Sequence, residues 1–301
     1  MKTRKKHILI VVLAVIVLAI VAFALSLAGA FDNYGSKQKT VLLQQSGLKV
    51  TARIDGRYIS RQEMDKWMIN RLRIAEKKLD LTPIPDGKPD SMLARLTEEK
   101  LRFSHQEIMD KLGSELSMSD KATSLMNTLS SGRTKYCITV MDVEGLDLNT
   151  FQREFDRLQN ENSPENLKAN IGVSPDHYYL GVNDKGALEV IENCGNNMMV
   201  SRFFITYGNE QGLNSPREAQ RYERQSTGHA QLENGNTAGG VRHQFHRTKD
   251  GFEAKLLVEF PALTPSTIIK NHQVHLALEF SNWVKYVKEH CNNSNEVNLK
   301  Q

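Results

Sequence analysis

The sequence of 301 residues has little cysteine and none of the short motifs that mark common catalytic or nucleotide-binding sites. Its three cysteines, Cys137, Cys194 and Cys291, are far apart and form no C-x-x-C pair. This excludes a small disulfide-stapled protein, and it leaves open one disulfide with a spare thiol or three thiols. G-x-S-x-G, H-E-x-x-H, Walker A and G-x-G-x-x-G do not occur. We therefore expect no bound cofactor and no metal centre.

The chain also lacks a strong excess of one charge. It has 39 basic and 35 acidic residues, and four of the basic ones, Lys2, Arg4, Lys5 and Lys6, precede the first apolar run. The rest of the chain is therefore neutral, whereas binding nucleic acid by phosphate neutralisation needs a basic excess on the folded part. We expect no nucleic-acid partner.

One uncharged apolar run, Ile8 to Phe31, lies near the N-terminus. It exceeds the roughly 20 helical residues that cross a hydrocarbon core of about 30 Å, and the basic residues before it should stay cytoplasmic. We expect a single-pass membrane protein with a signal anchor, held in the lipid bilayer through residues 8–31, with its body in the periplasm or outside the cell. A small-residue site at 28–30 leaves a cleaved signal peptide as the alternative.

Hydrophobic periodicity predicts helices in one half of the body and strands in the other. Ser60 followed by Glu63 is a capping box that begins a helix reaching about Asp80. Further helices are expected at 91–111, 117–129 and 147–158. Strands are expected at 48–54, 178–182, 199–207, 252–260 and 274–280.

These patterns predict an α+β protein built from successive parts. The predicted parts are a cytoplasmic tip and transmembrane helix at 1–31, a polar stalk at 32–47, a helical domain at 48–170, a β-rich domain at 171–290 and a polar tail at 291–301.

The helical half resembles the N-terminal chaperone region of the SurA and PpiD family of periplasmic folding factors. The resemblance rests on three stretches in the family's order, within about residues 48–160: IDGRYISRQEM at 54–64, IMDKLG followed by LSMSD at 108–120, and GLDLNTF at 145–151. It implies an extracytoplasmic folding factor that binds unfolded or newly translocated polypeptides.

Such binding needs an adaptable apolar surface, which methionine and aromatic side chains on amphipathic helices supply. The candidate client-binding residues are Met64, Trp67, Met68, Met109, Met118 and Met126. The alternative is that these side chains form the core between helices.

A prolyl isomerase domain of the parvulin type often follows in that family. Its nearest counterparts here are SRFFI at 201–205 and QVHL at 273–276. Arg202 replaces the first family histidine, so His275 is the only parvulin-like position that carries over. The alternative for His275 is a hydrogen-bonded histidine within a strand.

A second resemblance involves the same half. DGFEAKLLVEFPAL at 250–263 and YYLGV at 178–182 are similar to strands of DOMON-like and family-9 carbohydrate-binding sandwiches. This implies the alternative function, a cell-surface protein that binds a ligand or carbohydrate, for which Trp283, Tyr207 and Tyr222 are the available aromatic residues.

Three histidines, His229, His243 and His246, lie close together beside Arg242 and Arg247. A metal site would need carboxylate or cysteine partners. The glycine- and asparagine-rich surroundings indicate a long polar loop instead.

Overall fold

Ten strands pair into one antiparallel sheet in the computed structural model, which describes residues 35–195 and 199–298. The strand order is β1-β2-β4-β10-β9-β8-β7-β6-β5, and β3 pairs with β2. The strands are β1 (Leu43–Gln45), β2 (Leu48–Ile54), β3 (Arg57–Tyr58), β4 (Thr134–Glu144), β5 (His177–Val182), β6 (Leu188–Glu192), β7 (Ser201–Tyr207), β8 (Arg224–Gln231), β9 (Thr237–Arg247) and β10 (Gly251–Pro261). Strands β5 to β10 therefore form a meander, which β10 joins to β4 and β2.

Six helices accompany the sheet within the described residues. They are α2 (Arg61–Leu79), α3 (Pro89–Lys100), α4 (His105–Ser130), α5 (Leu148–Asn160), α6 (Pro164–Gly172) and α7 (Ser266–Asn298). Side chains that bond the first-turn backbone explain where α2 and α4 begin: Ser60 forms a capping box with Glu63, and Ser104 forms one with Glu107. The predicted capping box of Ser60 and Glu63 is thus confirmed.

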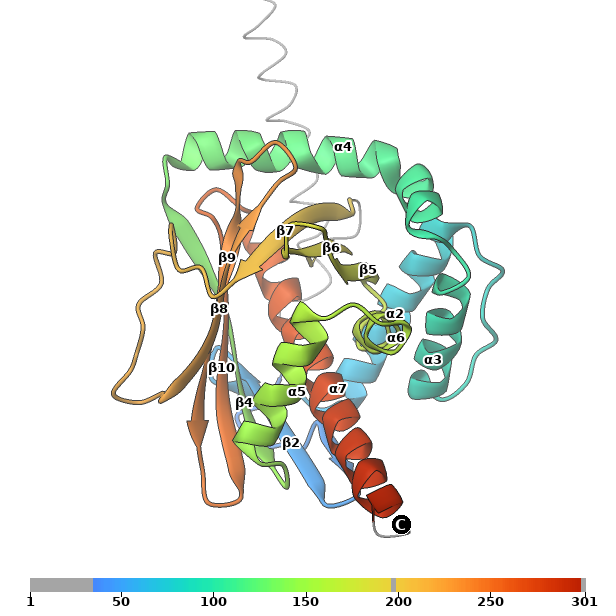
Figure 1. Ribbon diagram of the computed structural model, residues 1–301, viewed down its shortest axis with the longest axis vertical. Coiled ribbons are helices and arrows are strands. Elements are labelled where there is room, and N and C mark those ends of the chain that lie inside the picture. The colour runs from blue at the N-terminus through green and yellow to red at the C-terminus, as the bar shows by residue number, and fades with distance from the viewer. Residues whose placement is uncertain (1–34, 196–198, 299–301) are drawn as a thin grey trace, which may run out of the picture.

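The main core lies between the sheet and helix α7, with α5 beside it (Figure 1). The predicted apolar face of α5, which includes Phe151 and Phe155, is buried here. The ring centroid of Phe155 lies 5.4 Å from that of Phe280 and 5.1 Å from that of Trp283, both on α7. Aromatic contacts therefore fix α5 against α7.

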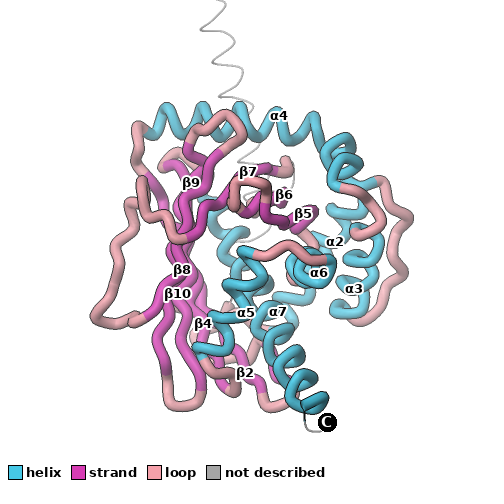
Figure 2. The backbone as a smooth tube through the Cα atoms, in the orientation of Figure 1, coloured by secondary structure: helices cyan, strands magenta, loops and turns pink. Residues whose placement is uncertain are grey.

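A second core covers the other face of β5 and β6. Leu72 of α2, Leu96 of α3 and Ile108 of α4 are buried together with Tyr178 of β5 and Ile191 of β6. Figure 2 shows α2, α3 and α6 grouped beside β5, and α4 lying across one end of the strands. Strands β5 and β6 are consequently covered on both faces.

The predicted fold class, a helical domain followed by a separate β-rich domain, is wrong. The segment predicted to be helical contributes β2 and β4, and β4 pairs with β10 along its whole length. Strand β4 alternates, with Cys137, Met141 and Val143 in the core. One edge of β4 pairs with β2 and the other pairs with β10. Strands from both halves of the chain therefore belong to one sheet, and the helices pack on that sheet.

The prediction of a single-pass, signal-anchored membrane protein with its body in the periplasm or outside the cell is also corrected. Across residues 35–195 and 199–298, no helix combines the length and the apolar composition needed to cross a membrane. Residues 8–31, on which the predicted bilayer contact depended, lie outside the described residues.

Candidate functional site

A cavity of about 150 Å³ lies between the inner face of the sheet and helix α7. Most of its wall is apolar and comes from strands β5 to β9 and α7. The apolar wall includes Leu180, Leu188, Val190, Ile205, Ala230, Val241, Leu276 and Phe280. Polar side chains line the same cavity as well, and His177, Glu192 and Glu279 are among them.

A β-bulge directs His177 toward the cavity. Leu180 also lines the cavity, so regular alternation along β5 would place His177 on the opposite face. The pairing of β5 with β6 shifts between His177 and Tyr179, and Tyr178 packs in the second core. The extra residue in the bulge thus changes the face to which His177 points.

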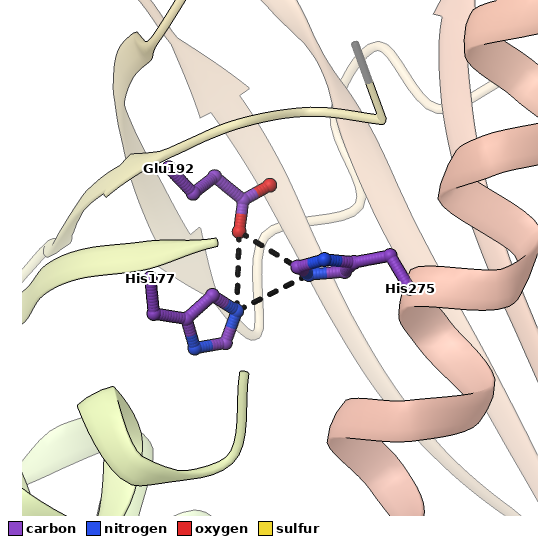
Figure 3. Close-up of side chains that lie close together, drawn as sticks. All are labelled: His177, Glu192 and His275. Atoms are coloured by element: carbon purple, nitrogen blue, oxygen red, sulfur yellow. Dashed lines mark hydrogen bonds and ion pairs between the residues drawn. The ribbon is translucent and has the colours of Figure 1, made fainter. Parts of the chain in front are cut away.

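The other polar side chains reach the cavity side through the regular strand alternation of β6 and the helical repeat of α7. Glu192 ends β6 and follows Leu188 and Val190 on the cavity side of that strand. His275 and Glu279 are four residues apart on α7, so they lie on one face of the helix. Figure 3 shows His177, Glu192 and His275 converging from β5, β6 and α7.

His177, Glu192, His275 and Glu279 form a tight group that we call the His–Glu cluster. The Nε2 atoms of the two histidines are 3.2 Å apart. Oε2 of Glu192 lies 3.4 Å from Nε2 of His177 and 3.6 Å from that of His275. Oε2 of Glu279 lies 3.1 and 3.3 Å from the same two nitrogens. Both imidazoles are fully buried, and each carboxylate side chain is 8% exposed.

Outer contacts orient both imidazole rings. Nδ1 of His177 lies 2.7 Å from the backbone carbonyl oxygen of Asn170, which only accepts, so Nδ1 carries a proton and Nε2 is the ring atom that faces Glu192 and Glu279. Nδ1 of His275 lies 3.4 Å from Oδ2 of Asp176. Nε of Arg71 donates to both oxygens of Asp176, at 2.8 and 2.9 Å.

Burial and opposite charge act against each other on these groups. Burial would lower the pKa of His275, but Glu279 and a hydrogen bond to Asp176 hold it well above its ordinary value. Burial would raise the pKa of Asp176, but Arg71 and His275 hold it below its usual range. The pKa of Glu279 is likewise lowered, by His275 and His177, against the effect of burial. These charges therefore keep the carboxyl groups of Asp176 and Glu279 ionised.

Lys100 of α3 supports the bulge from outside. Its Nζ donates to the carbonyl oxygens of Pro175 and His177, at 2.7 and 2.6 Å. Burial lowers the pKa of Lys100 to about 7, although Asp176 acts in the opposite direction. The backbone on either side of Asp176 is thus anchored by a buried amine.

The candidate client-binding residues do not form one surface. Met64, Trp67 and Met68 are buried in the main core, and Met109 packs, partly buried, against the second core. Met126 lines the cavity, and Met118 is 53% exposed on α4.

His275 lies in helix α7, so the strand predicted at 274–280 is wrong. Every residue from Val274 to Ser281 is buried, which hides the helical periodicity and makes the stretch resemble a strand. Arg202 lies on β7 and pairs with Glu189, away from the cluster.

The other predicted residues are spread over the sheet. His229, His243 and His246 lie on strands β8 and β9 rather than on a long loop, and only His243 of the three lines the cavity. Trp283 and Tyr207 line the cavity as well, whereas Tyr222 bonds Glu253 elsewhere.

His177, Glu192 and Glu279 are absent from the sequence-based candidates. The four-residue spacing of His275 and Glu279 is a usable signal once the segment is read as a helix. No family model matches the chain, and no match was found among curated proteins either.

Proposed function

We propose that the protein binds a small, mainly apolar molecule in the cavity between the sheet and α7, with one polar group of the ligand facing the His–Glu cluster. The observation that carries this proposal is an apolar space of about 150 Å³ with acidic and imidazole groups at one place in its wall. An apolar cavity of this size has room for a ring about the size of benzene.

The free energy of burying apolar surface favours a ligand in this cavity. Covering the apolar wall with an apolar ligand is favourable by about 25 cal/mol for each Å² of apolar surface removed from water. A ligand that fills the space gains this energy, and a polar group on it can bond the carboxylates or the His177 imidazole of the His–Glu cluster at the cavity wall.

Binding can be tested with benzyl alcohol, an apolar ring that carries one hydroxyl group. We expect saturable binding to the full chain, followed by methyl NMR shifts and by a rise in melting temperature, and none with glycerol. Ala230→Leu adds a side chain to the cavity wall and should abolish binding, whereas Ala94→Leu, on the exposed side of α3, should not. Equal binding by wild type and Ala230→Leu would refute the site.

A second candidate function, the binding of unfolded polypeptides implied by the family resemblance, has one supporting feature. Met118, Leu125 and Leu129 are exposed large apolar side chains on α4, spaced so that they share one helix face. A triple serine variant should then lose suppression of the light scattering of a client diluted from urea. If the wild-type chain does not suppress scattering at several-fold molar excess, this candidate fails.

A further inference from the structure

We propose that His177, Glu192 and His275, with Glu279 beside them, bind a divalent transition-metal ion. This proposal does not depend on the proposed function, although three of these side chains, His177, Glu192 and Glu279, also line the cavity. It starts from the described residues, among which His177, Glu192 and His275 offer ligand atoms that all lie within 4.8 Å of one another.

The spacing of these atoms suits a tetrahedral ion. The two Nε2 atoms and Oε2 of Glu192 form a triangle with edges of 3.2, 3.4 and 3.6 Å. Ligands about 2.0–2.1 Å from a tetrahedral Zn²⁺ are separated by about 3.3 Å. The protein thus already holds three ligand atoms near the separation that the ion requires.

The hydrogen bonding around the cluster shows why a cation fits there. The carbonyl oxygen of Asn170 fixes a proton of His177 on Nδ1, so its Nε2 is the ring atom that faces the cluster. Asp176 is placed to do the same for His275. Nε2 of each imidazole and one oxygen of each carboxylate therefore face one small volume, and an ion that replaces the Nε2 protons would meet four donor atoms there.

The outer contacts match those of metal-ligating histidines. Such histidines usually donate their second ring N–H to a carboxylate or a backbone carbonyl. His275 faces the carboxylate of Asp176, itself held by Arg71, and His177 faces a carbonyl oxygen. The protein thus supplies both the ligands and the groups that orient them.

The donor types indicate the class of ion. Two imidazoles with carboxylates suit Zn²⁺ and other first-row transition ions, whereas Mg²⁺ and Ca²⁺ favour oxygen donors alone. Protons are the competing occupants, because the cluster can also be neutralised by protonated imidazoles. A titration with Zn²⁺ distinguishes the two.

The test is isothermal titration of the EDTA-treated full chain with Zn²⁺, alongside Mg²⁺. We expect one Zn²⁺ per chain, a rise in melting temperature of about 5 °C or more at saturating ion, and much weaker binding of Mg²⁺. Glu192→Gln should weaken Zn²⁺ binding by at least roughly tenfold. Glu189→Gln is the matched control, because Glu189 lies on the same strand and is absent from both the cavity wall and the cluster.

Several results would overturn the proposal. They are absence of Zn²⁺ binding by the wild type, unchanged affinity in a Glu192→Gln variant whose circular dichroism shows it to be folded, and loss of binding in His246→Gln, which removes only an exposed histidine. Benzyl alcohol binding is measured on the metal-free chain, so failure of the metal site and failure of the proposed function are separable.

Discussion

Replacing Arg71 by methionine should destabilise the protein strongly, because it leaves a buried charge without its partner. The side chains of Arg71 and Asp176 are 2% and 0% exposed, and Nη2 of Arg71 lies 2.7 Å from Oδ1 of Asp176. Removing one member of such a pair costs about 3–5 kcal/mol. The nearest remaining cation is His275, whose Nδ1 lies 3.4 Å from Asp176, a longer and weaker contact.

The assay is urea unfolding of the full chain at neutral pH, followed by the fluorescence of its two tryptophans. The double variant Arg71→Met/Asp176→Asn removes the stranded charge, so we expect it to recover at least half of the lost free energy of unfolding. A loss below about 1 kcal/mol in the single variant, or an equal loss in the double variant, would refute the reasoning that the pair is buried and mutually required.

Three further predictions concern pH, backbone conformation and thiol chemistry. Burial lowers the pKa of His243 from an ordinary 6.5 to about 4. The neutral ring therefore contributes its full stability above about pH 6.5, and about 3 kcal/mol of the free energy of unfolding is lost as the pH falls toward 4. In His243→Gln the free energy of unfolding in urea should depend less steeply on pH in this window, and an unchanged slope would contradict this. Gly145 has φ +92°, and an added Cβ would lie 2.0 Å from the carbonyl oxygen of Gly47. Gly145→Ala should therefore lower the urea midpoint more than Gly235→Ala, whose added Cβ would meet open space. Equal losses in the two variants would refute the close approach. Cys137 is a free, buried thiol whose pKa burial raises well above its ordinary value; it should react with Ellman's reagent only after unfolding in urea, and mass mapping that finds it labelled in native protein would contradict this.

Local signals in the sequence predicted several elements well. The Ser60–Glu63 capping box marks the start of α2, and the apolar spacing from Leu148 to Leu158 gives α5. The strands predicted at 178–182 and 252–260 correspond to β5 and β10. In each case the information lies within a few neighbouring residues.

Where tertiary contacts decide the outcome, the same reasoning failed. Strand β4 was missed because its alternation makes sense only with β10 beside it. The segment around His275 reads as a strand because burial on all sides of α7 removes its polar face. The helix expected at 91–111 was wrong for a local reason, because α3 ends at Lys100 and the capping box of Ser104 and Glu107 begins α4, which continues to Ser130.

The His–Glu cluster could be found only in part from the sequence. The spacing of His275 and Glu279 fits one helix face, but His177 faces them because of a β-bulge. Glu192 joins through the register of β6 against β5. Neither the bulge nor the register is encoded in a short motif, so these two residues become visible only in the fold.

Anomalous diffraction at the zinc edge, from crystals of the full chain grown with Zn²⁺, tests the central claim most directly. We predict one strong peak about 2.0–2.1 Å from Nε2 of His177 and of His275 and about 2.0–2.2 Å from a carboxylate oxygen of Glu192. Peaks only at surface residues, with the His–Glu cluster empty, would contradict the account.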